Sequence, residues 1–139
     1  MAVHTQTLQF PTRGDGDTLD ITREVASAVA SSGLRDGIAA LFVVGSTAGL
    51  TTIEFEPGAV ADLGAAFERI APQGVEYRHH LHWHDDNGHS HVRAALLGPS
   101  LVVPFSGGRL ALGPWQQIIL VDFDTRPRKR EVVTQLIGE

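Results

Sequence analysis

The chain has 139 residues, which is the size of one domain built around a single hydrophobic core. Apolar residues make up 42% of the chain and charged residues 19%, as in globular proteins, and no apolar run approaches the roughly 18 residues of a membrane span. The formal net charge of −5 argues against non-specific nucleic-acid binding, which depends on neutralisation of phosphates by Lys and Arg.

The chain lacks cysteine and a secretory signal, and both absences limit what we expect of it. The chain contains no cysteine, so any metal would be held by His, Asp, Glu or water. Residues 1–5 carry neither the basic nor the apolar segment of a secretory signal. We therefore expect a soluble, cytoplasmic protein without a nucleic-acid or membrane partner.

The first part of the chain predicts a strand, a helix and a second strand. Residues 3–10 alternate polar and apolar side chains, which predicts a half-buried strand that Pro11 ends. Asp20 can cap a following helix, and Gly33 can end it. Residues 38–44 form a continuous apolar run, which predicts a strand covered on both faces.

The next segment combines a candidate anion-binding turn with a strand and a helix. Ser46 and Thr47 follow the apolar run, and their backbone N–H groups could hold an anion, although a simple turn explains them equally well. Residues 51–56 alternate like a strand, with Glu54 on the polar face, where it could reach a site. Residues 59–70 have the apolar spacing of an amphipathic helix.

Residues 77–91 hold six of the seven histidines and the adjacent carboxylates Asp85 and Asp86. Imidazole and carboxylate are common metal ligands and general acids or bases near neutral pH. This density predicts a metal or proton-transfer site, although a solvated histidine-rich loop is the alternative. As a strand, residues 77–84 would place the histidines at 80, 82 and 84 on one face, and residues 85–88 would form a turn.

The remainder predicts one more helix followed by strands. Residues 92–97 favour a helix that Ser90 or Asn87 could cap, with His91 near its start, where the helix dipole would lower the pKa of the imidazole. Gly107-Gly108 predicts a hairpin. Four later runs predict strands, over residues 100–105, 109–112, 115–123 and 131–137.

Two of these C-terminal segments suggest more specific roles. The basic residues 126–130 are interpreted as a solvated hairpin tip, because no basic face or interleaved aromatic residues accompany them. Residues 115–121 are too apolar to be bare on a monomer, which predicts a closed symmetric oligomer with the histidine cluster near a subunit boundary.

Several motifs together resemble one known family. They are Ser46-Thr47-Ala48-x-Leu50-Thr51-x-Ile53-Glu54, Tyr77-x-His79, Asp85-Asp86-Asn87, His91-Val92-Arg93-x-x-Leu96-Leu97-Gly98-x-Ser100-Leu101, Leu110-x-Leu112-Gly113-x-Trp115-Gln116 and Ile137-Gly138-Glu139. In order and spacing they resemble the YjbQ, or UPF0047, family over nearly the whole chain. The resemblance implies one α+β domain over residues 1–139, with mostly antiparallel sheets and about three helices. It also implies a homotrimer and secondary thiamine-phosphate synthase activity.

The resemblance also assigns candidate site residues. It implies site histidines at His79 and His91, a carboxylate at Asp86, another at Glu54, and a cation at Arg93. Most members of the family carry a histidine at the position where this chain has Gly45. A cluster histidine would then have to supply the missing ligand, and the candidates are His80, His82, His84 and His89.

These residues give one leading hypothesis of function and two alternatives. The leading hypothesis is an enzyme acting on phosphorylated small molecules with a divalent metal, zinc being the candidate. The catalytic candidates are Glu54, Asp86 and His91; the phosphate-holding candidates are Ser46, Thr47 and Arg93; the metal-ligand candidates are His79, His91, His82 and His84. The alternatives are a metal- or metabolite-binding trimer without turnover and a metal-assisted hydrolase.

Overall fold

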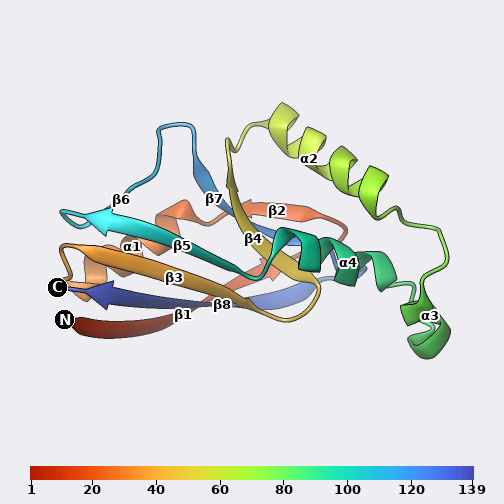
Figure 1. Cartoon of the computed structure of the whole chain (residues 1–139), viewed down its shortest axis with the longest axis horizontal. Helices are drawn as coiled ribbons and strands as arrows, with labels where there is room; N and C mark the ends of the chain where they lie inside the picture. The colour runs from red at the N-terminus through yellow and green to blue at the C-terminus, as the bar shows by residue number, and fades with distance from the viewer.

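The computed structural model describes residues 1–139 as two antiparallel sheets and four helices (Figure 1). The five-stranded sheet has the order β1 (Ala2–Thr12), β8 (Arg128–Gly138), β3 (Gly37–Val44), β5 (Ser100–Ser106) and β6 (Arg109–Leu110). The three-stranded sheet has the order β2 (Asp17–Asp20), β7 (Gln117–Asp122) and β4 (Ala48–Ile53). The helices are α1 (Thr22–Ser32), α2 (Pro57–Ile70), α3 (Arg78–Trp83) and α4 (Gly88–Leu97). The expected α+β class is confirmed, with four helices in place of about three.

The central strand of the three-stranded sheet, β7, is buried on both faces. Ile118 and Leu120 belong to the main core beneath the five-stranded sheet, whereas Ile119 and Val121 pack in a second core with side chains of α2 and α4. This double burial explains the unbroken apolar sequence of β7. The expectation that residues 115–121 need a partner subunit is therefore wrong, because Ile118 to Val121 are covered within the chain.

Strand β3 is less buried than its sequence predicted, since a strand covered on both faces was expected. Ala39, Leu41 and Val43 are buried in the main core, whereas Phe42 is 49% exposed and Val44 is 47% exposed. The strand is thus covered on one face only, because no helix packs on the outer face of the five-stranded sheet in one chain (Figure 1).

Turn chemistry accounts for the ends of the first two helices. The Asp20 carboxylate accepts hydrogen bonds from the Thr22 N–H and hydroxyl, and Gly33 ends α1 with φ at 77°. Glu56 caps α2 by accepting hydrogen bonds from the Gly58 and Ala59 N–H groups. The strand expected over residues 51–56 therefore ends earlier, at Ile53, and Glu54 lies in the connection to α2.

The histidine-rich segment forms a helix and not the expected strand. Residues 78–83 make the short helix α3, at the end of the molecule away from both chain termini and beyond the edges of the two sheets (Figure 1). No strand lies there to pair with it, so backbone hydrogen bonds are made within the segment. The connection through Asp85 and Asp86 forms a bend, as expected, and α4 begins at Gly88, earlier than the expected residue 92.

Candidate active site

A cavity of about 430 Å³ lies where α3, the start of α4, the β3–β4 connection and the β7–β8 connection meet. Its lining contains histidines and carboxylates from these segments and two arginines from the start of β8. They are Gly45, Ser46, Thr47, His79, Trp83, Asp85, Asn87, His91, Asp124, Arg128 and Arg130. We call this space the histidine cavity.

The two histidines that the sequence placed in one site do lie together. His79 is on α3 and His91 on α4, and their ring centroids are 4.3 Å apart. Burial lowers the pKa of His91 below its ordinary value, and the neighbouring His79 lowers it further, while Asp85 and Asp124 partly oppose the shift. The direction agrees with the expectation, but the cause is burial. His91 is therefore neutral at pH 7.

Three buried polar atoms of the histidine cavity have no hydrogen-bond partner in the protein. They are His79 Nδ1, Asn87 Oδ1 and Asp124 Oδ1, and Thr134 Oγ1 is the one other such atom. His79 Nδ1 is 3.3 Å from Asp85 Oδ1, but the contact lacks the geometry of a hydrogen bond. Each unpaired buried polar group costs about 1–3 kcal/mol. Their concentration in one cavity is typical of a ligand site.

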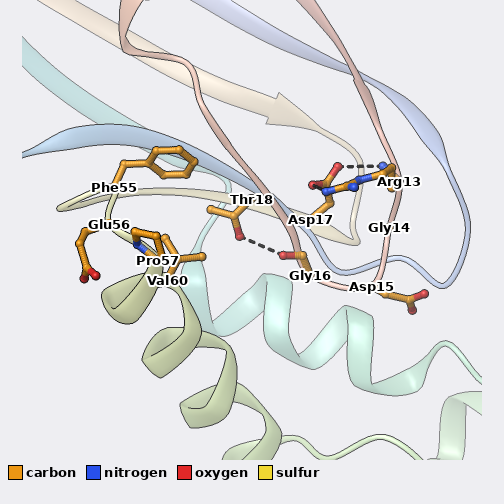
Figure 2. A pocket seen from close by; sticks show the side chains of 10 residues that line it. All are labelled: Arg13, Gly14, Asp15, Gly16, Asp17, Thr18, Phe55, Glu56, Pro57 and Val60. Carbon is orange, nitrogen blue, oxygen red and sulfur yellow. Dashed lines mark hydrogen bonds and ion pairs between the residues drawn. The ribbon is translucent and has the colours of Figure 1, made fainter.

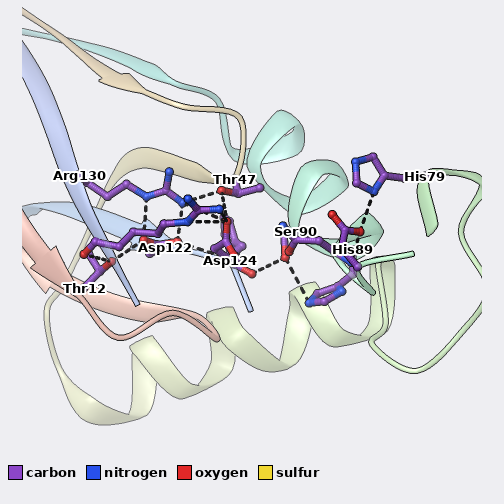
Figure 3. A network of polar contacts seen from close by, with 12 residues as sticks. Thr12, Thr47, His79, His89, Ser90, Asp122, Asp124 and Arg130 are labelled. Atoms are coloured by element: carbon purple, nitrogen blue, oxygen red, sulfur yellow. Dashed lines mark hydrogen bonds and ion pairs between the residues drawn. The ribbon is translucent and has the colours of Figure 1, made fainter. Parts of the chain in front are cut away.

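The wall of the cavity is a buried ion-pair network (Figure 3). Arg130 donates to both oxygens of Asp122, with Nε to Oδ2 and Nη2 to Oδ1 each at 2.7 Å, and Nη2 also donates to the Thr47 hydroxyl. The Thr12 hydroxyl also donates to Asp122 Oδ2. The side chains of Arg130 and Asp122 are 8% and 0% exposed. The interpretation of residues 126–130 as a solvated tip is therefore wrong for Arg130.

Asp124 continues this network toward the cavity. Its Oδ2 accepts hydrogen bonds from the Thr47 hydroxyl at 2.9 Å and from Arg128 Nε at 3.2 Å. Burial would raise the pKa of Asp124, but the hydrogen bond from Thr47 and the charge and hydrogen bonds of its neighbours outweigh it and lower the pKa. Asp124 is thus an anion at pH 7.

Other candidate residues from the sequence lie outside the histidine cavity. Arg93 is buried, donates to the Ala71 carbonyl at 2.9 Å and forms an ion pair with Glu68, so it holds α4 to α2. Glu54 is exposed and does not line this cavity. The structure therefore does not bring Arg93 or Glu54 together with His79 and His91.

The remaining cluster histidines divide between a second cavity and the surface. Asp86 and His80 line a neighbouring cavity of about 550 Å³, where the Asp86 N–H donates to His80 Nδ1 at 3.1 Å. His89 lines the same cavity and lies against the Gln73 amide, with 3.0 Å between their Nε2 atoms. His82 and His84 are exposed and line neither cavity.

No group of three or more His, Cys, Asp or Glu side chains is arranged to hold a metal ion. His79 and His91 are the only cluster histidines in the histidine cavity, and Asn87 and Asp124 line it with them. Gly45, where the resemblance implied a histidine in most relatives, supplies no side chain to the cavity. The side chains of one chain therefore do not form a complete three-ligand zinc site.

A third cavity of about 430 Å³ lies between the Arg13–Thr18 loop and the start of α2 (Figure 2). Apart from the exposed Asp15 carboxylate, its polar side chains are already paired with one another or with backbone. Arg13 forms an ion pair with Asp17 at 3.1 Å, the Thr18 hydroxyl donates to the Gly16 carbonyl, and Glu56 caps α2. The histidine cavity, with its unpaired buried atoms, is the better candidate for a functional site.

The sequence interpretation missed Arg130, Arg128 and Asp124. A signal was available, because Asp122 and Asp124 at the end of one strand and Arg128 and Arg130 at the start of the next are each spaced by two residues. Residues at that spacing lie on the same side of a strand, so two such pairs on either side of a short connection can meet.

The fold and the cavity define a class of small, antiparallel α+β domains with a histidine pair beside a buried arginine–aspartate network. The chain belongs to the UPF0047 family, since the family model described as UPF0047 protein YjbQ-like matches residues 6–139. No helix is long and apolar enough to cross a membrane.

Relatives and solved structures agree with this assignment. A UPF0047 protein from Archaeoglobus fulgidus is 37% identical over 121 residues, covering 87% of this chain and 91% of the relative. One from Methanothermobacter thermautotrophicus is 35% identical over 139 residues, covering 100% and 95%. The crystal structure of a YbjQ-like protein of unknown function from Sulfolobus solfataricus superposes with a TM-score of 0.94 at 32% identity, covering 99% of each chain.

Proposed function

We propose that this protein is a secondary thiamine-phosphate synthase-like enzyme that acts on phosphorylated small molecules in the histidine cavity. The supporting observation is the set of three unpaired buried atoms, on His79, Asn87 and Asp124, around one space that also holds two arginines. A cavity on which polar side chains from several elements converge is suited to bind and orient a polar substrate.

The proposed reaction joins a pyrimidine pyrophosphate to a thiazole phosphate. A C–O bond to pyrophosphate breaks, a C–N bond to the thiazole nitrogen forms, and pyrophosphate leaves with the bonding electrons. We assign phosphate binding at the rim to Arg128, whose side chain is 37% exposed, and to the backbone at the exposed Ser46, whereas Thr47 is buried and its hydroxyl is bonded to Asp124. The attacking thiazole nitrogen carries no proton, so neutral His91 is assigned a hydrogen bond that orients the substrate and not a proton transfer.

A divalent metal remains a separate proposal, with zinc as the candidate and His79 and His91 as the protein ligands within the cavity. Because one chain lacks a third side-chain ligand in the required arrangement, no step of the proposed reaction passes through a metal. Elemental analysis of purified protein tests this part: one equivalent of zinc, lost in a His79→Ala variant, would support it, and metal-free active protein would contradict it.

Direct assay of thiamine-phosphate formation tests the enzymatic proposal. His91→Asn removes the imidazole that orients the substrate and should lower the rate by about 10²-fold, because a small misplacement of the reacting atoms is costly. His84→Ala is the matched control, because His84 is exposed and outside the cavity, and should leave the rate unchanged. No product from the wild-type protein with both substrates present would contradict the proposal.

We further propose a homotrimer, supported by a different surface from the one the sequence suggested. The outer face of the five-stranded sheet exposes a group of apolar side chains, which we call the sheet face. They are Val3, Ile38, Phe42, Val44 and Val102, which are 59%, 39%, 49%, 47% and 55% exposed. Contiguous apolar surface of this kind is characteristic of subunit interfaces.

This surface also adjoins the proposed site. Val44 on the sheet face directly precedes Gly45, which lines the histidine cavity. A second copy covering the sheet face would therefore approach the cavity, as expected for a site near a subunit boundary. Sedimentation measurements on purified protein test the assembly, and a monomer across micromolar concentrations would contradict it.

A further inference from the structure

Three adjoining cavities form one groove along α2, away from the histidine cavity. The cavity beside the Arg13–Thr18 loop, of about 430 Å³, and the cavity beside His89, of about 550 Å³, both adjoin a smaller one of about 240 Å³. Asp15 lines all three, Val60 lines the first and the smaller one, and Gln73 lines the smaller one and the cavity beside His89. We call the joined space the α2 groove.

The α2 groove carries an excess of negative charge. Its lining holds six carboxylates and two guanidinium groups. Both arginines already form ion pairs, Arg13 with Asp17 and Arg93 with Glu68. The groove should therefore attract a cation and repel a phosphorylated ligand.

The carboxylates without a cation partner lie at the two ends of the groove. Asp15, Glu76 and Asp86 are exposed at one end, and no Lys or Arg lines the cavity there. Figure 2 shows the Asp15 carboxylate extending away from the ion pair of its own loop. Glu56 lines the other end, where it accepts only backbone hydrogen bonds. No three His, Asp or Glu side chains converge as a metal ion requires, so this charge suits an elongated cation.

The middle of the groove is largely apolar. Five hydrophobic side chains line the smaller cavity: Val60, Leu63, Phe67, Val121 and Phe123. The α2 residues that line the groove run from Pro57 to Glu68, which is about 16 Å at the rise of an α-helix. Methylene groups are stabilised against such a surface, because they leave water there. The order of acidic, apolar and acidic lining matches ammonium groups joined by methylene segments.

A buried imidazole with an unpaired nitrogen lies at the more acidic end. His89 is 4% exposed, and its Nε2 lies 3.0 Å from Gln73 Nε2 and 3.4 Å from the Ser90 hydroxyl oxygen. The Ser90 hydroxyl donates to the Phe123 carbonyl, so toward His89 it can only accept. This favours the ring proton on Nε2, and the exposed Gln73 amide can turn its oxygen to the same proton. His89 Nδ1, which makes no hydrogen bond in the protein, is then an acceptor for an N–H donor in the cavity that His89 lines.

We propose that the α2 groove binds a linear aliphatic polyamine. Its ammonium groups pair with the carboxylates of Asp15, Glu76 and Asp86 at one end and with Glu56 at the other. One N–H donates to His89 Nδ1, and the methylene segments lie along the apolar side of α2. The groove is separate from the histidine cavity, so its occupation is independent of the proposed reaction.

Calorimetric titration of the full chain at pH 7.5 and low ionic strength, with spermidine and with hexaamminecobalt(III), tests the site. Both ions carry three positive charges and N–H donors, but only spermidine has methylene segments. We expect spermidine to bind at least about tenfold more tightly, because only its chain covers the apolar middle of the groove. Equal affinities would show an acidic surface without a site for the chain and would overturn the proposal.

Two variants with the same change of charge locate the binding. Asp15→Asn should weaken spermidine binding by about threefold to fivefold, since it removes one exposed carboxylate from the groove. The fold should be retained, because Asp15 has φ at 53° and asparagine tolerates this conformation. Glu24→Gln is the matched control: Glu24 is exposed on α1 and lines none of the three cavities, so affinity should be unchanged. Equal affinities of the two variants for spermidine would contradict the proposed site.

Discussion

His89 and His91 make stability depend on pH in a defined direction. Burial is the main cause that lowers the pKa of each, with added repulsion from Arg93 for His89 and from His79 for His91. The unfolded chain therefore takes up protons more readily than the folded chain below the ordinary value of 6.5. The stabilisation that comes from keeping these histidines neutral should be complete above about pH 6.5. The free energy of unfolding should decrease as the pH falls below that value.

Denaturant titrations at pH 7.5 and pH 5.5 measure this effect. His89→Gln should reduce the difference in unfolding free energy between the two pH values, because glutamine does not titrate there. His82→Gln is the control, since His82 is exposed. An identical pH dependence in the His89 variant and the wild type would show that His89 does not contribute.

Arg130 is predicted to be the most costly arginine to remove. Arg130→Met would leave the carboxylate of Asp122, which is 0% exposed, without its bidentate partner. The loss of one partner of a buried pair costs about 3–5 kcal/mol. Arg128→Gln removes a half-exposed partner of Asp124 and should cost about 1 kcal/mol or less after solvent screening. Urea denaturation of both variants compares them, and equal losses would contradict the role assigned to Arg130.

At the level of elements, the contact between α3 and α4 holds the histidine pair together. Gly88 is the first residue of α4, and a Cβ there would lie 2.4 Å from Tyr77 Cβ, immediately before α3. Gly88→Ala should therefore push the two helices apart and destabilise the protein by about 1–3 kcal/mol. The same displacement should separate His79 from His91 and lower thiamine-phosphate formation.

A second glycine in a helix provides the comparison. Gly64 lies within α2, and a Cβ there meets nothing within 4 Å. Gly64→Ala should raise the unfolding free energy by about 0.5–1 kcal/mol, because alanine favours the helix. Thermal denaturation of both variants distinguishes them. A Gly88→Ala protein as stable as the wild type, with normal activity, would show that this close approach is not needed.

Sequence patterns predicted well those elements whose structure depends on neighbouring residues in the chain. The alternation in residues 3–10 corresponds to β1, and Gly107-Gly108 corresponds to the turn between β5 and β6. Strand β7 and helix α3 show the limits. The burial of β7 depends on α2 and α4 packing on one side, and α3 is a helix because no strand lies nearby. Neither fact is contained in the local sequence.

The candidate site was predictable to the same extent. Family spacing paired His79 with His91, and the structure places both in one cavity. The sequence could not separate His79 and His91 from His82 and His84. The segment was expected to be a strand, and a strand and a helix place these histidines on different faces. The arginine–aspartate network joins segments far apart in the chain, such as Thr47 with Arg130, and such contacts follow only from the tertiary fold.

At the level of the whole molecule, the sheet face determines the predicted assembly. Phe42 lies on the outer side of β3 and is 49% exposed, so a polar substitution there is compatible with the fold of one chain. Phe42→Asp would place a carboxylate in the proposed interface, where burial of an unpaired charge is unfavourable. We expect this variant to sediment as a monomer at concentrations where we expect the wild type to sediment as a trimer.

The position of Val44 beside Gly45 gives this variant a second consequence. If a neighbouring subunit shields the histidine cavity, the monomeric variant should retain its fold and lose activity. Trp115→Asp is the matched control, because Trp115 is also an exposed aromatic residue, at 74%, but is not among the residues of the sheet face. It should remain trimeric. A trimeric Phe42→Asp protein would place the interface elsewhere, and a fully active monomer would show that each chain holds a complete site.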